Sequence, residues 1–427
     1  MRTLEEWLAY IERQHTRPIA LGLDRVRAVS ARLGQRQDLP VVLVGGTNGK
    51  GSTCAMLERI LLCAGYRVGL YTSPHLLAYN ERVRIGGRPA ADDALCEGFA
   101  RVEAARTAGD EVALTYFEIG TLAAWEVFAR QPLDVVIMEV GLGGRLDATN
   151  LYQPVVSIVT GIDLDHMDYL GPTREDIGFE KAGIFRAGRP AICGDRRPPR
   201  RLFDHALAIG AQLWLLGRDF DFQRQEGQWQ YSGPAGRRSG LALPALRGAD
   251  QLINASCVLA ALDVLHDVLP VAMQDIRRGL LDVELPGRFQ VLPGRPTVVL
   301  DVAHNPQAAR SLADSLGGMP FPPATWAVFG MMRDKDIAGV VQAVSHRIDR
   351  WLPASLEGPR GASAAEVVAA LAACGVGEGL PSFVSPAVAL GHALGQAGED
   401  DRIVAFGSFL TVADVMRSLN ADAAKRH

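Results

Sequence analysis

Residues able to hold a phosphate chain are concentrated in positions 45–53, which read G-G-T-N-G-K-G-S-T. Glycines let successive backbone N–H groups converge on phosphate oxygens, while Lys50 would neutralise the β- and γ-phosphates and Ser52 could reach a magnesium ion. The stretch departs from the usual pattern G-x-x-x-x-G-K-[ST], because Gly51 separates Lys50 from Ser52 and Val44 replaces the first glycine. A tight strand-to-helix turn with an incidental lysine is the alternative. Three glycines around a lysine directly after an apolar run favour a nucleotide site.

Two further residues are candidates for binding a metal ion near such a loop. Glu139 ends the apolar run V-V-I-M-E-V, where phosphate-loop proteins place a carboxylate that binds magnesium directly or through water. His166 follows in T-G-I-D-L-D-H-M-D-Y-L-G, where neighbouring aspartates can fix its tautomer. The alternatives are that Glu139 pairs with Arg145 or a helix end, and that His166 is merely hydrogen-bonded in place.

A second set of polar residues lies in the last third of the sequence. Asp301, in D-V-A-H-N-P, could accept hydrogen bonds from ribose hydroxyls, and His304 could bond a base or a carboxylate. Pro306 would begin a helix. Arg288 could reach a phosphate, and Ser408 follows another apolar run in F-G-S-F-L-T. Together these residues predict phosphate-binding groups in one domain, polar pocket groups in another, and a cleft between them.

Short runs rich in valine and isoleucine must position these residues. The runs alternate with longer helix-like stretches, which is typical of a parallel sheet with crossover helices. Nearly every run ends in Gly, Asp, Glu or His, and open α/β sheets bind ligands beyond the carboxyl ends of their strands. For any single strand, the simpler explanation is that glycine or aspartate ends it. The predicted strands are residues 41–44, 134–140, 155–160, 297–302, 326–330 and 402–407.

The length of 427 residues indicates two domains. We predict an α/β fold with a P-loop ATPase-like domain, built on a mostly parallel sheet, over residues 1–286. A smaller Rossmann-like α/β domain is predicted over residues 287–427. The polar region 196–247 is expected to form a small antiparallel excursion within the first domain. Three prolines in residues 285–296 are typical of an interdomain connector.

The composition is that of a soluble globular protein, with 48% hydrophobic residues, 22% charged residues and a net charge of -4. This charge argues against nucleic-acid binding through a general basic field. The sequence contains no run of about 18 or more apolar residues, so no membrane span is predicted. The six cysteines form no C-x-x-C pair, and the N-terminal M-R-T-L-E-E-W-L-A-Y-I-E predicts an amphipathic helix, not a signal peptide. We therefore expect a cytoplasmic protein with small-molecule partners. No apolar seam demands a second copy, so we expect a monomer.

Further motifs extend along the chain: Y-T-S-P-H-L, Y-N-E-R-V-R-I, L-T-Y-F-E-I-G-T, E-V-G-L-G-G-R-L-D-A-T-N, E-K-A-G-I-F-R, L-P-G-R-F-Q and F-G-S-F. With the phosphate loop, D-L-D-H-M-D-Y-L-G and D-V-A-H-N-P, they resemble the folylpolyglutamate synthase and dihydrofolate synthase family of the Mur ligase superfamily. The resemblance runs from Leu21 to the last predicted strand. In that family Gly51 is the expected spacing of the loop.

The resemblance implies an ATP-dependent amide ligase of folate biosynthesis and one-carbon metabolism. A substrate carboxylate would attack the γ-phosphate to give an acyl phosphate, and the α-amine of L-glutamate would then displace phosphate. ATP and two Mg²⁺ ions are implied, and a requirement for K⁺ is left open. The residues implied for ATP are Asn48, Gly49, Lys50, Gly51, Ser52, Thr53, Asn254, Arg288 and Asp301.

The same resemblance assigns Ser73, Glu139 and His166 as magnesium ligands. Lys181, in E-K-A-G-I-F, matches the lysine that the family carboxylates to a carbamate, and the alternative is a surface lysine. Lys50, His166 and Lys181 are then the catalytic set, while His304 and Ser408 match the region that receives glutamate. The residues matched to the pterin or folate pocket are Gly22, Leu23, Asp24, Arg25, Thr115, Tyr116, Phe117, Glu118, Leu146, Asp147 and Ala148.

The segments T-Y-F-E and L-G-L-D-R-V favour an enzyme that makes dihydrofolate from 7,8-dihydropteroate and also extends reduced folates with glutamate. Phe117 could stack on a pteridine ring or be an ordinary core aromatic. One alternative is extension of folates only. A second is a Mur-type peptidoglycan ligase, which would need a nucleotide-sugar domain where only 44 residues precede Gly45. A third is an ATP-driven switch that needs neither dihydropteroate nor glutamate.

Overall fold

The computed structural model describes residues 2–15, 19–35, 38–377 and 379–425. The chain separates into two compact units. The first comprises the chain up to Ala245 together with Leu252–Val283, and the second comprises Leu246–Gln251 and the chain from Glu284 onward. The division near Val283 lies close to the boundary expected after residue 286, whereas the expected domains did not place Leu246–Gln251 with the second unit.

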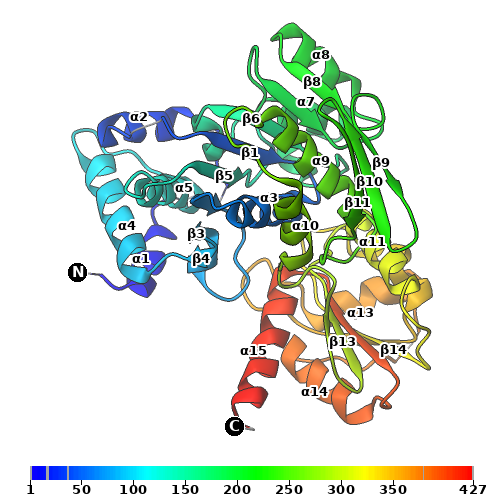
Figure 1. Cartoon of the computed structure of the whole chain (residues 1–427). Helices are drawn as coiled ribbons and strands as arrows, with labels where there is room; N and C mark the ends of the chain where they lie inside the picture. The colour runs from blue at the N-terminus through cyan, green and yellow to red at the C-terminus, as the bar shows by residue number, and fades with distance from the viewer. Residues whose placement is uncertain (1, 16–18, 36–37, 378, 426–427) are drawn as a thin grey trace. The chain divides into compact units, whose positions relative to one another are not determined.

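An eight-stranded, mostly parallel sheet forms the centre of the first unit (Figure 1). The strand order is β4-β3-β2-β5-β1-β6-β7-β8, in which β3 pairs antiparallel with β2 and with β4 and the other pairs are parallel. The strands are β1 (Val41–Gly45), β2 (Val68–Tyr71), β3 (Val83–Ile85), β4 (Arg88–Pro89), β5 (Val135–Glu139), β6 (Pro154–Val159), β7 (Pro190–Cys193) and β8 (Gln212–Leu215). Val44 pairs with Glu139 on one side and Ile158 on the other, so β1, β5 and β6 end at the same edge.

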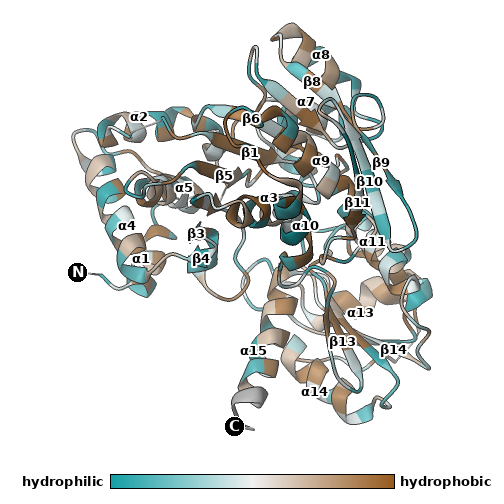
Figure 2. Cartoon of the chain, in the orientation of Figure 1, coloured by the Kyte–Doolittle hydropathy of each residue, from teal (hydrophilic) through white to brown (hydrophobic). Residues whose placement is uncertain are grey.

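Helices cover both faces of this sheet, which explains why its central strands are continuous apolar runs. Every residue of β1 and β5 is buried, and Figure 2 shows both strands as hydrophobic. The helices are α1 (Leu4–Ile11), α2 (Asp24–Leu33), α3 (Lys50–Cys63), α4 (Asp92–Thr107), α5 (Tyr116–Phe128), α6 (Met167–Leu170), α7 (Arg174–Ala182), α8 (Arg200–Ala208), α9 (Gln251–Val264) and α10 (Met273–Asp282), with 3-10 helices η1 (Tyr79–Arg82) and η2 (Ala148–Leu151). The N-terminal helix is confirmed as α1, with a capping box between Thr3 and Glu6.

The predicted antiparallel excursion is only partly correct. A three-stranded antiparallel sheet of order β11-β10-β9 does form, from β9 (Asp221–Arg224), β10 (Gln228–Gly233) and β11 (Gly236–Ala242). Before it, however, α8 and β8 continue the α/β alternation, and β8 joins the large sheet parallel to β7. The helix forms here because Leu202 and Ala206 lie four residues apart, so they bury one face of α8 although the segment is rich in arginine.

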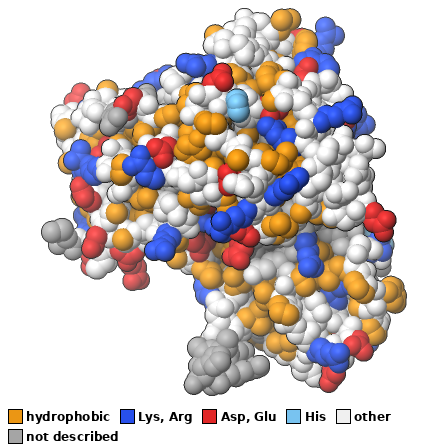
Figure 3. Space-filling model, in the orientation of Figure 1, with side chains coloured by type: hydrophobic (Ala, Val, Ile, Leu, Met, Phe, Trp, Pro, Cys, Tyr) orange, Lys and Arg blue, Asp and Glu red, His pale blue; other side chains and the backbone are white. Residues whose placement is uncertain are grey.

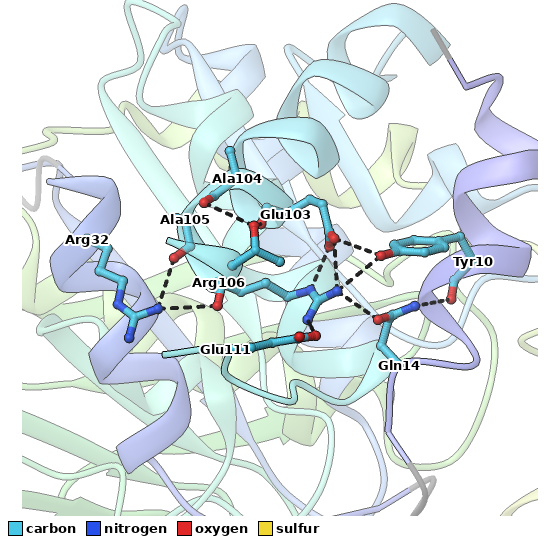
Figure 4. Close-up of polar contacts among 9 residues, drawn as sticks. Tyr10, Gln14, Arg32, Glu103, Ala104, Ala105, Arg106 and Glu111 are labelled. Carbon is cyan, nitrogen blue, oxygen red and sulfur yellow. Dashed lines mark hydrogen bonds and ion pairs between the residues drawn. The ribbon is translucent and has the colours of Figure 1, made fainter. Parts of the chain in front are cut away.

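A buried arginine fastens the N-terminal helices to each other. Arg106 lies at the end of α4, with only 2% of its side chain exposed. Its guanidinium donates hydrogen bonds of 2.6–3.1 Å to the side chains of Tyr10, Gln14, Glu103 and Glu111 (Figure 4). From α2, Arg32 donates to the backbone oxygens of Ala105 and Arg106. These bonds hold α1, α2 and α4 together, and Glu111 fixes the loop that leads to Thr115.

The second unit is a smaller α/β domain around a five-stranded sheet of order β12-β13-β16-β14-β15. Its elements are β12 (Gln290–Leu292), β13 (Thr297–Leu300), α11 (Pro306–Gly317), β14 (Thr325–Phe329), α12 (Ile337–Val344), η3 (Ser345–Arg347), β15 (Arg350–Pro353), α13 (Ala364–Ala373), α14 (Pro386–Gln396), β16 (Arg402–Phe406) and α15 (Phe409–Lys425). All pairs are parallel except β12 with β13. The proline-rich connector is therefore shorter than predicted, because Pro286 and Pro293 flank β12 without interrupting it.

The face of the molecule drawn in Figure 3 is mixed in charge. Figure 3 shows basic and acidic side chains interspersed on the visible face. Among the described residues, no helix combines the length and the apolar character that crossing a membrane requires.

Candidate active site

The loop between β1 and α3 is held tightly by its neighbours. Gly46 and Gly49 have φ angles of 143° and 88°, a region that glycine enters without strain. A Cβ atom on Gly46 would collide with the Thr160 hydroxyl, and one on Gly49 would collide with the Asn254 side-chain oxygen. Thr160 also donates a 2.6 Å hydrogen bond to the backbone oxygen of Asn48. The N-terminal end of α3, with its backbone N–H groups, therefore opens onto a fixed loop, which is the geometry of a phosphate site.

Two side chains at this helix end fit a phosphate chain. Lys50 folds back over the loop, and its Nζ donates to the backbone oxygens of Gly46 (3.0 Å) and Thr47 (3.2 Å). Thr53 is fully buried, and its Oγ1 has no hydrogen-bond partner among the described residues. Buried polar atoms without partners are rare in folded proteins. The ammonium of Lys50 and the hydroxyl of Thr53 are thus donors at this helix end, and their binding of phosphate oxygens stays a prediction.

Replacing Gly49 with alanine should weaken nucleotide binding. The loop holds residue 49 in a left-handed conformation, which strains an alanine, and the new Cβ would displace the side chain of Asn254. Keeping the loop in its shape would therefore cost about 1–3 kcal/mol. We expect Gly49→Ala to raise the dissociation constant of ATP by about tenfold or more, measured by calorimetric titration. Gly65→Ala is a matched control, since Gly65 has a φ of 87° but a Cβ added there would meet no atom within 4 Å. Equal ATP affinity in both variants would contradict the role of the loop.

Ser73 and Glu139 meet at the carboxyl edge of the sheet. Glu139 ends β5, is buried, and accepts a 3.1 Å hydrogen bond from the backbone N–H of Ser73. The alternative that Glu139 pairs with Arg145 is wrong, because Arg145 forms its ion pair with Glu180 at 2.8 Å. The side chain of Glu139 thus lies at the strand end where a metal-binding carboxylate was predicted.

His166 lies at the start of α6 in a left-handed conformation, with φ at 51°. Its Nε2 is 3.9 Å from Asp165 Oδ1, beyond hydrogen-bonding distance. Across the part of the chain that the structure describes, no three His, Cys, Asp or Glu side chains cluster closely enough to hold a metal ion. A metal here would need other oxygen ligands as well. Magnesium commonly binds through one or two carboxylates plus substrate phosphates, so Glu139 and Ser73 beside the phosphate loop fit such an ion.

Lys181 is buried, so its interpretation as a surface lysine is wrong. It lies in the last turn of α7 with 3% of its surface exposed. Burial, followed by repulsion from Lys50, lowers the pKa of Lys181 to about 7, against the opposing attraction of Asp165 and Asp147. A substantial share of this amine is therefore neutral near pH 7. Lys181 therefore lies close enough to interact electrostatically with Lys50 of the phosphate loop and with Asp165, the residue before His166.

The three segments matched to the pterin pocket contact one another. Gly22 donates from its backbone N–H to Leu146 (3.2 Å), and Arg25 forms an ion pair with Glu118 at 2.7 Å. Glu118 also completes a capping box with Thr115 at the start of α5. Segments far apart in the sequence therefore converge on one region of the first unit.

Phe117 and Asp147 are both fixed within this region. The ring of Phe117 is half-buried, lies 6.0 Å from that of Tyr71, and fills the space where a side chain on Gly141 would stand. Asp147 accepts hydrogen bonds from the backbone N–H of Leu142 (2.8 Å) and from the hydroxyl of Thr149 (2.6 Å). Burial raises the pKa of Asp147, while these hydrogen bonds oppose the rise.

The site residues predicted in the second unit also gather together. Asp301 follows β13 and accepts 2.8 Å hydrogen bonds from the backbone N–H groups of Phe289 and Ala303. The rings of His304 and Phe409 are 6.2 Å apart, and the Arg288 guanidinium lies 5.2 Å from the same Phe409 ring. Ser408 precedes Phe409 and is buried.

Phe409 thus links Arg288, His304 and Ser408, a role that sequence patterns did not assign to it. The only sequence signal for it was its position in F-G-S-F, directly after Ser408. The cleft between the two domains, and the roles of the individual residues, stay predictions.

The first unit has a phosphate-loop-like turn at the carboxyl edge of a mostly parallel sheet, and a second α/β unit follows it. Residues 44–198 match the model of the Mur ligase middle domain, and residues 287–409 match that of the Mur ligase glutamate ligase domain. The protein is accordingly an ATP-dependent ligase with the predicted two-part α/β fold.

The particular family follows from full-length relatives. The chain is 46% identical to the dihydrofolate synthase/folylpolyglutamate synthase of Escherichia coli K12, over 98% of this chain and 96% of that protein. It therefore belongs to the dihydrofolate synthase/folylpolyglutamate synthase family. This finding favours a folate ligase over a peptidoglycan ligase or an ATP-driven switch.

Solved structures agree with this placement. Escherichia coli FolC in complex with DHPP and ADP matches with a TM-score of 0.93 and 45% identity, covering 99% of each chain. A bifunctional folylpolyglutamate synthase/dihydrofolate synthase with Mn, AMPPNP and L-glutamate bound matches with a TM-score of 0.90 and 44% identity, covering 98% of each chain. Relatives of this chain thus bind nucleotide, divalent metal and glutamate.

Proposed function

We propose that this protein joins L-glutamate through an amide bond to 7,8-dihydropteroate, forming dihydrofolate, and also to reduced folates and their polyglutamates. The acceptor carboxylate attacks the γ-phosphorus of ATP, so that ADP leaves and an acyl phosphate forms. The α-amine of glutamate then attacks the acyl carbon, and the tetrahedral intermediate expels phosphate. The contacts Gly22–Leu146 and Arg25–Glu118 carry the dihydropteroate assignment, because they join the three segments matched to the pterin pocket.

Charge neutralisation and alignment are the main demands of this chemistry. Lys50 would leave the backbone oxygens that it now contacts and neutralise the transferring phosphate, while the N-terminal end of α3 binds phosphate oxygens. Glu139, Ser73 and His166 would hold Mg²⁺, which screens the charges of the reacting phosphates. Two such ions, and the use of K⁺, are part of this proposal.

Lys181 would act after conversion to a carbamate. The ammonium first loses one proton, and the neutral amine then attacks the carbon of CO₂. An N–C bond forms, one C=O π pair moves onto oxygen, and a second proton passes from nitrogen to solvent, so that the cation becomes a carbamate anion. The burial of Lys181 and its pKa of about 7 support this step, because only the uncharged amine is nucleophilic. The product would be an oxygen ligand for the divalent ion.

The second unit would receive glutamate at His304 and Ser408, with Arg288 and Asp301 contacting the nucleotide. We further infer a monomer that works in the cytoplasm without nucleic acid. All six cysteines are free thiols, which is typical of proteins in a reducing compartment.

A product assay tests the function directly. The protein would be given ATP, Mg²⁺ and L-glutamate with either 7,8-dihydropteroate or a reduced folate, and products would be identified by mass spectrometry. We expect glutamate-dependent phosphate release and one added glutamyl unit with each acceptor. Product from the folate alone would leave folylpolyglutamate synthase activity only, and phosphate release that ignores both acceptors would contradict the ligase.

A further inference from the structure

The loop that follows β5 wraps around the last turn of α7. The backbone N–H of Arg145 donates to the backbone oxygen of Glu180 (2.8 Å), and the Arg145 guanidinium donates to Glu180 Oε1 at 2.8 and 3.1 Å. Arg145 thus binds both the main chain and the side chain of Glu180. Glu180 is the immediate neighbour of Lys181.

Two glycines allow this close approach. A Cβ on Gly144 would lie 2.8 Å from the backbone oxygen of Glu180, and one on Gly183 would overlap the Arg145 side chain. The amide of Asn150 closes the contact by donating to the backbone oxygens of Arg145 and Gly183, at 3.0 Å each. The loop and the helix end are therefore packed without space for adjustment.

The side chain of Arg145 also packs against Phe179, another residue of α7. Its guanidinium lies 5.7 Å from the ring of Phe179, and that of Arg201 lies 4.7 Å from the same ring. Arg201 pairs with Asp176 on α7, but it does not belong to the loop. Both arginines therefore pack against Phe179, but only Arg145 also pairs with Glu180, the residue next to Lys181.

The geometry points to Arg145 as a positioning residue for Lys181. Through Glu180 it fixes the last turn of α7, and this keeps the Lys181 side chain buried in the orientation required for carbamate formation. The assignment rests on the proposed carbamate. This role of Arg145 is distinct from the acceptor pocket. In this stretch of the chain, only Leu146, Asp147 and Ala148 were matched to that pocket.

The test measures the modification itself, not only activity. Wild type, Arg145→Ala and the matched control Arg201→Ala would be loaded with isotopically labelled bicarbonate, and NMR would quantify the carbamate carbon. We expect Arg145→Ala to need about 10- to 100-fold more bicarbonate for half-occupancy, the usual effect of losing a residue that orients a metal-site ligand. Arg201→Ala should match wild type. High bicarbonate should restore both the signal and kcat in Arg145→Ala but not in Lys181→Ala.

Glu180→Gln serves as a second variant in case Arg145→Ala does not fold, since it keeps the acceptor oxygen and loses only the charge. It should show an intermediate bicarbonate requirement. Full carbamate occupancy at the wild-type bicarbonate concentration in a folded Arg145→Ala or Glu180→Gln protein would overturn the positioning role. Absence of a carbamate signal in wild type would instead overturn the proposed modification, and the role of Arg145 with it, while the product assay would still report ligase activity.

Discussion

Lys50→Ala is expected to lower kcat for ATP-dependent ligation by about 10²–10³-fold, the usual cost of removing one group that stabilises charge developing in a transition state. Lys50 is the cation of the predicted phosphate loop, and its Nζ lies 3.0 Å from the oxygen of Gly46, the residue directly after β1. Glutamate-dependent phosphate release at saturating ATP measures the effect.

The control for Lys50 is Arg59→Ala. Arg59 lies on the same helix, more than two turns after Lys50, and pairs with Asp282 at 3.3 Å. This variant should retain the wild-type rate, and thermal unfolding would show that both variants fold. Full activity of a folded Lys50→Ala protein would refute the phosphate-loop assignment.

Lys181→Ala should lower kcat by about 10- to 100-fold if Lys181 supplies an anionic ligand. Lys181→Arg should fail equally, although it keeps a positive charge, because a guanidinium cannot form the carbamate. Acetate should partly restore Lys181→Ala by placing a carboxylate in the vacated space, and it should not help Lys181→Arg. If Lys181→Arg kept its activity, the residue would act as a cation and the carbamate would be excluded.

The pH dependence supplies an independent check on Lys181. The pKa of its amine is lowered to about 7, so protonation removes the nucleophilic form as the pH falls through that value. At limiting bicarbonate, kcat and the carbamate signal should therefore both fall below about pH 7. Acetate-rescued Lys181→Ala should lack this step, since it has no amine to protonate. A common pH profile for both proteins would assign the step to another group.

Local patterns were sufficient for the central strands and the phosphate loop. The apolar runs at β1, β5, β6, β13, β14 and β16 were predicted because both faces of a parallel sheet are buried, which leaves a continuous hydrophobic signal. Short or more polar strands such as β8 gave no such signal, and their place in the sheet depends on neighbours elsewhere in the chain. The same limit applies to β12, whose flanking prolines resembled a connector.

The sequence by itself determined the donors of the phosphate loop and their order, because a glycine-rich turn between a strand and a helix is specified by residues adjacent along the chain. Tertiary structure alone decided that Arg145 pairs with Glu180 and not Glu139, that Lys181 is buried, and that this burial lowers the pKa of its amine to about 7. Burial and ion pairing depend on residues that folding brings together, so neither can be read from a lysine in E-K-A-G-I-F.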